Sequence, residues 1–233
     1  SPPRSWAEVD LSALRHNLAA ARGLSDQQVM AVVKASAYGH GLEAVACALE
    51  QEEIAFFGVA NVGEARRLSK TGVRTPIYLL GGTFPAEREE VVAHRWLPCL
   101  NTMEEALHFD ELARNGGAVV EAHLTVDTGM GRGGFLSTEA PAALEAIRAL
   151  PGIQVTGLGS HLPSADEDIE FTRTQFEAFD SLVESLPRRN ELKHVHLANS
   201  AGLLGYRSRT TTLVRPGLLL YGVSPLDGHG GAL

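Results

Sequence analysis

A lysine directly follows an apolar run in the stretch VVKASAYGHG, residues 32–41. Tyr38 comes four residues after Lys34, and glycines stand at positions 39 and 41. An amine that is partly desolvated and carried by a rigid element can form an imine with a carbonyl compound. Taken alone, Lys34 is equally compatible with an exposed lysine at the end of a strand, so other residues have to decide between the two interpretations.

Several more polar residues follow apolar segments further along the chain. Ser200 and the backbone amides around Gly217 and Leu218 could bind a phosphate group, and Ser200 could also cap a helix. An imine-forming lysine opposite a phosphate site suits either pyridoxal phosphate or a sugar-phosphate substrate of an aldolase. The other polar residues in such places are Asp127, Arg132, His161, Asn199 and Arg215.

His161 could instead be a metal ligand, because Asp166 and Glu167 lie close to it in the sequence. Neither H-x-x-E-H nor H-E-x-x-H spacing occurs there, so we expect no metal site. A histidine ring stacked on a planar cofactor is the favoured interpretation. His194 and His196 share one face of a predicted strand, where packing in the core is the expected role.

The elements that must position these residues alternate between strand-like and helix-like patterns. Apolar residues at three- and four-residue spacing predict helices over 62–71, 102–114 and 169–186, and one from Leu11 with Asp10 as its N-cap. The alternation predicts an α/β fold, a parallel (β/α)8 barrel of the TIM type. A doubly wound sheet is the alternative, but no G-x-G-x-x-G follows the first strand. The predicted strands are residues 29–35, 55–60, 76–81, 97–100, 119–126, 153–161, 194–198 and 218–223.

In such a barrel the carboxyl ends of the strands meet at one rim, where catalytic groups lie. The polar residues named above follow different predicted strands, so we expect them to converge there. We assign the barrel to residues 11–224. The Gly-rich end DGHGGAL suggests that residues 225–233 begin a linker to a further domain.

Composition narrows the class of protein. With 44% hydrophobic and 21% charged residues, the chain is expected to be globular. A net charge of −8 disfavours nucleic acid and anionic membranes as partners. Cys47 and Cys99 are too few and too far apart for a disulfide framework, and no apolar run has the length of a membrane span. A cytoplasmic enzyme domain is expected.

Six stretches of the sequence resemble, in order and spacing, the signature blocks of bacterial alanine racemases. They extend from Trp6 to Pro225 and read WAEVDLSALRHNL, VVKASAYGHG, VDTGMGRGGF, GLGSHLPSADE, HLANSAG and LVRPGLLLYGVSP. The resemblance implies a barrel that binds pyridoxal phosphate, followed by a mostly β C-terminal domain that these 233 residues do not contain. Residues 1–10 would form a strand that pairs with that domain, and the full-length protein would be a homodimer.

The resemblance also implies roles for individual residues. Lys34, Arg132 and His161 would be catalytic: Lys34 holds the cofactor as an imine and is the base on the face of the D-isomer. Arg132 would contact the phenolic oxygen of the cofactor and the substrate carboxylate, and His161 would lie beside the ring. Arg215 would hydrogen-bond the pyridine nitrogen. The remaining cofactor-binding residues would be Tyr38, Ser200, Gly217 and Leu218 at the phosphate, with Asn199 beside them.

The proposed base has to be neutral to accept a proton. An unperturbed lysine has a pKa of ~10.4 and is therefore mostly protonated at pH 7. Two neighbouring guanidinium groups and a dry pocket both lower the pKa of an amine. We therefore expect Arg132, Arg215 and burial together to favour the neutral form of Lys34.

The sequence departs from the family pattern in three places. Ser36 stands where an acidic or amide residue is usual. Thr125 stands where many members carry a carbamylated lysine that supports the counterpart of Arg132. The base on the opposite face is a tyrosine of the C-terminal domain, which reaches the site across the dimer interface. We therefore expect these 233 residues alone to be weakly active or inactive.

Three functions remain open from the sequence. The first is an alanine racemase that interconverts L- and D-alanine by two-base proton transfer and supplies D-alanine for peptidoglycan. The second is a stand-alone barrel that binds pyridoxal phosphate for cofactor homeostasis, which the chain length favours. The third is an imine-forming aldolase. The block DTGMGRGGF favours the racemase, with alanine as its small-molecule partner.

Overall fold

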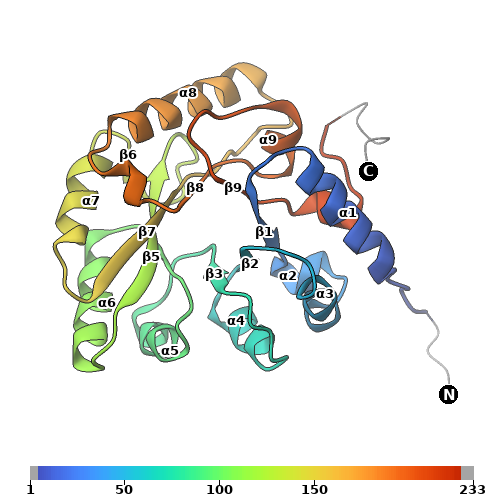
Figure 1. Ribbon diagram of the computed structural model, residues 1–233, viewed down its shortest axis with the longest axis horizontal. Coiled ribbons are helices and arrows are strands. Elements are labelled where there is room, and N and C mark those ends of the chain that lie inside the picture. The colour runs from blue at the N-terminus through green and yellow to red at the C-terminus, as the bar shows by residue number, and fades with distance from the viewer. Residues whose placement is uncertain (1–4, 227–233) are drawn as a thin grey trace.

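Eight parallel strands form a barrel that is surrounded by helices (Figure 1). The computed structural model describes residues 5–226. Neighbouring strands follow the order β3-β2-β1-β9-β8-β7-β5-β4, and a parallel bridge between Tyr78 and Leu97 joins the two ends. The strands are β1 (Gln28–Val32), β2 (Phe56–Val59), β3 (Ile77–Leu79), β4 (Cys99–Leu100), β5 (Val120–Asp127), β7 (Ile153–Gly159), β8 (His194–His196) and β9 (Leu213–Val214).

Several helices begin where the sequence places capping residues. Asp10 accepts hydrogen bonds from two amides at the start of α1 (Leu11–Gly23), and Asn61 caps α4 (Val62–Ser69). Thr102 and Asp168 cap α6 (Met103–Asn115) and α8 (Ile169–Ser185) in the same way. The predicted helices are thus confirmed. The others are α2 (Lys34–Tyr38), α3 (Leu42–Leu49), α5 (Arg88–His94), α7 (Ala140–Arg148) and α9 (Ser200–Gly205).

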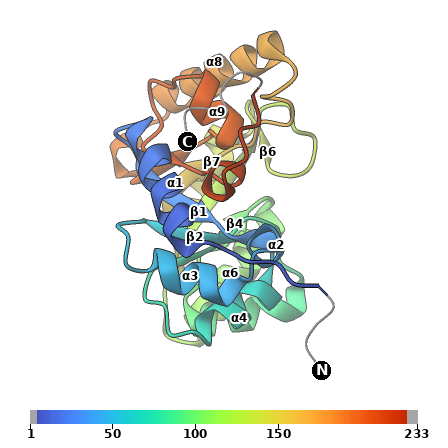
Figure 2. The same ribbon diagram turned by 90° about the vertical axis from the view of Figure 1, so that its right-hand side faces the viewer.

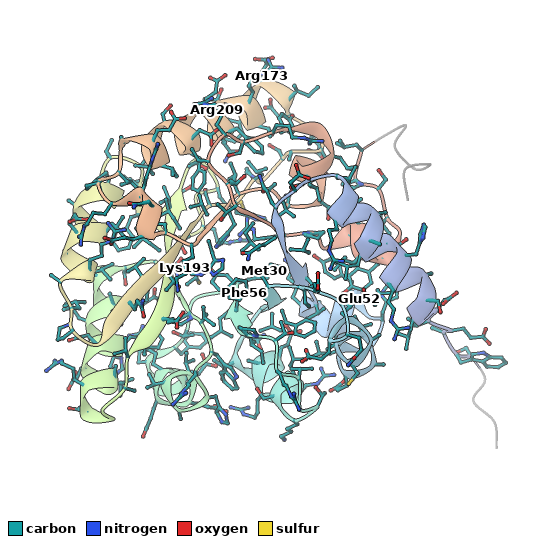
Figure 3. The ribbon with its side chains drawn as sticks, in the orientation of Figure 1. Met30, Glu52, Phe56, Arg173, Lys193 and Arg209 are labelled. Atoms are coloured by element: carbon teal, nitrogen blue, oxygen red, sulfur yellow. The ribbon has the colours of Figure 1, made fainter. Side chains whose placement is uncertain are left out.

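Apolar side chains fill two regions. The larger region lies between the strands and the surrounding helices and includes Phe57, Phe109 and Phe179. The smaller one fills the inside of the barrel, where Met30 and Phe56 lie near the centre of Figure 3. A filled interior leaves one end of the barrel for chemistry. No helix among residues 5–226 is long and apolar enough to cross a membrane.

The eighth strand lies earlier in the chain than we predicted. Residues 218–223 are not a strand: Leu218–Tyr221 form a short 3-10 helix, η3, and the eighth strand is β9 (Leu213–Val214). Pro216 lacks an N–H group and cannot continue the ladder. The apolar run after it instead buries Leu219 and Leu220 in the core. The η3 segment packs against α1 (Figure 2).

The two ends of the chain leave part of the predicted domain organisation open. Residues 5–10 are exposed and form no strand, and Trp6 is 70% exposed. Pairing of this segment with a further domain stays a prediction. Residues 1–4, and 227–233 of the predicted linker, lie outside the described residues.

A short additional strand, β6 (Phe135–Leu136), pairs with the end of β5.

Two histidines pair inside the barrel. His123 and His196 are fully buried, with 2.9 Å between Nδ1 of His123 and Nε2 of His196. Added Cβ atoms at Gly157 and Gly159 would overlap their rings, so these glycines make room for the pair. Burial lowers the pKa of His123 to about 3 and also lowers that of His196. The packing role predicted for His196 is confirmed, whereas His194 is only half-buried.

We expect acid to destabilise the fold through these histidines. The folded-state pKa lies below the unfolded value near 6.5, so the folded state is favoured above that pH and loses stability as the pH falls below it. At pH 5, one such histidine lowers the free energy of unfolding by about 2 kcal/mol. Urea unfolding at pH 7 and pH 5 should show a smaller difference for His123→Asn than for the parent chain. An unchanged difference would contradict this prediction.

Candidate active site

Every residue that we assigned to the site lines one cavity at the carboxyl ends of the strands. The cavity has a volume of about 230 Å³. Residues far apart in the sequence therefore meet at the rim that the barrel predicts. They are Lys34 and Tyr38 after β1, Arg132 after β5, His161 after β7, Asn199 and Ser200 after β8, and Arg215, Gly217 and Leu218 after β9.

Lys34 begins a turn of unusual handedness. β1 ends at Val32, and the residues after Lys34 form the short helix α2 with left-handed backbone angles, such as φ 53° and ψ 47° at Ala35. Gly39 ends the turn with a φ of 87°, which glycine adopts without steric cost. The turn directs Lys34 and Tyr38 into the same cavity.

The surroundings of Lys34 favour its neutral form. Burial lowers the pKa of Lys34, and the charges of Arg132 and Arg215 lower it further. The charge of Glu64 acts in the opposite direction. The directions expected from the sequence for burial and the two arginines are confirmed, and Glu64 is an additional influence that the sequence did not indicate.

Ser200, Gly217 and Tyr38 form a compact cradle. Ser200 Oγ accepts hydrogen bonds from the amides of Gly217 and Leu219, at 3.0 and 3.3 Å. A Cβ atom at Gly217 would overlap the Tyr38 hydroxyl, so only glycine allows this approach. Within residues 5–226, the amide of Leu218 donates no hydrogen bond. The cradle thus has hydroxyl and amide groups available for an anion.

Arg215 is anchored by one of its nitrogens. Nη2 donates to the carbonyl oxygen of Leu197 at 2.9 Å and to that of Ser160, and lies 3.3 Å from His161 Nδ1. In the described part of the chain, Nε and Nη1 have no protein acceptor. Burial lowers the pKa of Arg215 to about 10, which leaves the guanidinium charged at pH 7. It can therefore donate hydrogen bonds into the cavity but cannot accept any.

His161 is neutral in this environment. Burial, followed by the charges of Arg215, Arg132 and Lys34, lowers its pKa to about 3. Its Nδ1 can then accept a hydrogen bond from Arg215. Among residues 5–226 no group of three metal-binding side chains is found. A neutral ring at the side of the cavity suits contact with a planar ligand.

Arg132 is placed by its loop. It is exposed, and within residues 5–226 its side chain has no ion-pair or hydrogen-bond partner. Contrary to the expectation that it would join the other polar residues, Asp127 does not line the cavity; its carboxylate accepts hydrogen bonds from the amides of Gly129 and Gly131 and so shapes the loop. An added Cβ at Gly134 would come within 2.9 Å of Thr125. Hydrogen bonds from the loop amides to Asp127 and the close packing of Gly134 against Thr125 thus shape the loop that carries Arg132.

Sequence reasoning missed several residues that line the cavity. Tyr78 and Cys99 form part of its floor and come from β3 and β4. Burial raises the pKa of the Cys99 thiol to about 11, so the thiol is protonated at pH 7. Both residues lie inside apolar strand segments, where the sequence predicts that they pack in the core. Asp166 lines the rim, without other carboxylates close enough to form a metal site among the described residues.

Comparison with known proteins identifies similar chains. Residues 9–225 match the family described as "Alanine racemase, N-terminal domain". A protein of Carboxydothermus hydrogenoformans named alanine racemase is 37% identical over 223 residues, which cover 94% of this chain and 60% of the relative. This chain therefore spans about 60% of the length of that relative.

Solved structures agree with this likeness. An alanine racemase of Clostridium difficile 630 has a TM-score of 0.92 and 30% identity, over 97% of this chain and 60% of its own. The alanine racemase of Bartonella henselae, solved with covalently bound pyridoxal phosphate, has a TM-score of 0.83 and 28% identity, over 95% of this chain and 61% of its own. Both likenesses cover nearly the whole barrel.

Proposed function

We propose that this chain, which belongs to the alanine racemase family, is the cofactor-binding barrel of an enzyme that interconverts L- and D-alanine. The observation that carries the proposal is the convergence of Lys34, Arg132, Arg215 and the Ser200 cradle on one cavity. Because the chain spans about 60% of the length of its relatives, the activity is proposed for the protein that includes the rest. We further propose that it is a cytoplasmic homodimer that supplies D-alanine for peptidoglycan.

Pyridoxal phosphate fits the groups that line the cavity. We assign Lys34 as its covalent anchor, since it is the lysine of the cavity. The phosphate would be bound by Tyr38, Ser200 and the amides of Gly217 and Leu218. Nε or Nη1 of Arg215 would donate a hydrogen bond to the pyridine nitrogen, which a guanidinium leaves unprotonated. When bound, the cofactor withdraws electrons from the α-carbon of an attached amino acid and acidifies its α-proton.

The residues of the chain then have to bind alanine and move a proton. The guanidinium of Arg132 would bind the substrate carboxylate. The neutral amine of Lys34 would accept the α-proton from one face, that of D-alanine. His161 would contact the cofactor ring, and Asn199 would line the pocket beside the phosphate. A second base for the opposite face would come from a part of the protein outside these 233 residues.

One assay separates this function from the alternatives. The product of the complete coding sequence should racemise L- and D-alanine, and its gene should support growth of a strain that requires D-alanine. Bound pyridoxal phosphate without racemisation would favour the homeostasis barrel instead. The aldolase is disfavoured because the matched family is that of the alanine racemases.

The cradle predicts that Gly217→Ala weakens cofactor binding. The new methyl group would displace the Tyr38 hydroxyl from the position where it faces the phosphate. We expect the Kd for pyridoxal phosphate to rise about tenfold or more, which corresponds to ~1.4 kcal/mol. Gly23→Ala is the matched control, because a Cβ atom there meets no atom within 4 Å. Equal affinities of the two variants in a fluorescence titration would exclude the assigned phosphate site.

A further inference from the structure

The backbone after Lys34 adopts a conformation that L-amino acids avoid. Ala35, Ser36, Ala37 and Tyr38 have φ values between 51° and 56°. Left-handed angles cost roughly 1–2 kcal/mol for each residue with a Cβ atom. Four in succession persist only if the surroundings impose them. Because Lys34 and Tyr38 belong to this turn, whatever holds the turn also places two residues of the cavity.

Glu64 of α4 binds this turn from outside. Its Oε1 accepts a hydrogen bond from the amide of Ser36 at 3.0 Å, and its Oε2 accepts one from the amide of Ala60 at 2.9 Å. Ala60 directly follows β2, so the carboxylate connects the turn to a neighbouring strand. Among residues 5–226, no other side chain accepts a hydrogen bond from an amide of the turn. Glu64 is therefore the side chain that holds the backbone of this turn, whereas Arg67 Nη2 donates to the Ser36 hydroxyl at 3.4 Å.

The carboxylate is itself held in place. The amide of Glu64 donates to the Oδ1 of Asn61, the N-cap of α4, at 3.0 Å. This bond fixes the first turn of the helix on which Glu64 stands. Both carboxylate oxygens are occupied, and the side chain is half-buried. Its orientation toward the Lys34 turn is thus determined by the helix start.

Charged or titratable groups from several other elements line the cavity with Lys34, among them Tyr78 of β3, Cys99 of β4 and Asp166. Arg132 follows β5, Arg215 follows β9, and the neutral His161 follows β7. The two arginines and burial lower the pKa of the amine, whereas the charge of Glu64 raises it. Glu64 is therefore the carboxylate that opposes the arginines at this amine.

We propose that Glu64 is a positioning residue for Lys34. Its carboxylate connects the left-handed turn to β2 and supplies a negative charge that partly offsets the charges of two arginines at the amine. The inference rests on the proposed function of Lys34 as the anchor of pyridoxal phosphate. It assigns Glu64 two separable effects: on the geometry of the amine, and on the pH at which the amine becomes reactive.

The reaction of the cofactor-free chain with pyridoxal phosphate measures both effects. The chain has three lysines, so Lys70→Ala and Lys193→Ala leave Lys34 as the only lysine. In this background, the rate of covalent attachment is followed as a function of pH. The midpoint, which is the pH at which this rate is half-maximal, reports the charge state of the amine. The plateau, which is the maximal rate at high pH, reports how well the amine is placed. No activity on alanine is needed for either readout.

Glu64→Gln should move the midpoint to lower pH. At pH 7 the rate should rise about three- to tenfold, because a larger fraction of the amine is neutral. The plateau should fall less than in Glu64→Ala, since the amide oxygen of the new glutamine side chain can still accept from Ser36, although its NH2 group cannot accept from Ala60. Glu90→Gln is the matched control: Glu90 pairs with Arg66 on the exposed side of α4. Coinciding profiles of the two variants would overturn the effect on charge.

Glu64→Ala removes the connection to the turn altogether. We expect its plateau rate to fall about tenfold, and adding Ala35→Gly should restore part of it, because glycine adopts left-handed angles freely. An unchanged plateau with an unchanged circular dichroism spectrum would overturn the positioning role. If Glu64→Ala does not fold, the comparison of Glu64→Gln with its control decides the inference. A parent chain that does not react at Lys34 would instead contradict the proposed function.

Discussion

The Lys34→Ala variant is expected to lose covalent attachment of pyridoxal phosphate completely while keeping the barrel folded. Lys34 lies at the rim of the cavity and is only half-buried, so the core does not depend on it. An alanine side chain has no amine that could form the attachment. Incubation with pyridoxal phosphate, borohydride reduction and mass measurement of the intact protein should show no added mass.

The other two lysines provide the controls for this experiment. Lys70 is exposed after α4, and Lys193 is exposed at the amino end of β8; neither residue lines the cavity. Lys70→Ala and Lys193→Ala should retain the added mass. If Lys34→Ala still gains the mass of one cofactor and either control loses it, the anchor has been assigned to the wrong lysine.

The second large effect concerns proton transfer by the 233-residue chain alone. Racemisation needs a base on each face of the α-carbon, and we assign one base here, Lys34. A positioned acid or base contributes about 10²–10⁴-fold to a rate. We therefore expect the chain loaded with pyridoxal phosphate to racemise alanine at least about 10²-fold more slowly than the full-length enzyme.

Solvent deuterium exchange at the α-carbon distinguishes the two faces. D-Alanine should exchange its α-proton faster than L-alanine, because its proton would face Lys34. Both exchanges should be followed separately, with Lys34→Ala as the control that lacks this base. Turnover of both isomers at the rate of the full-length enzyme would mean that the second base lies within these 233 residues.

Local signals explain why most of the fold could be predicted from the sequence. Asp10, Asn61 and Asp168 accept hydrogen bonds from amides within three residues of them, so their side chains alone mark the starts of helices. The long apolar runs at β1 and β5 likewise identify strands. The predicted position of the eighth strand was wrong for two reasons. The strand itself, β9, has only two residues, and the longer apolar run that follows it forms a 3-10 helix.

The sequence predicts which of the assigned residues form the site, but it does not predict how they are arranged. Strand ends predict which residues meet, and the cavity contains all of those that we assigned. The left-handed turn at Ala35–Tyr38 has no glycine, so nothing in its sequence predicts positive φ angles. The Glu64 bridge joins residues 28 positions apart, and the His123–His196 pair joins residues 73 positions apart. Such contacts depend on the closed barrel and cannot be inferred from local patterns.

Peptide mapping after reduction of the loaded chain tests the central claim most directly. The chain is incubated with pyridoxal phosphate, reduced with borohydride and digested, and the peptides are sequenced by mass spectrometry. The assignment predicts one modified peptide, with the cofactor on Lys34. Modification of Lys70 or Lys193 alone, or no modified lysine at saturating cofactor, would contradict the placement of the cofactor in this cavity.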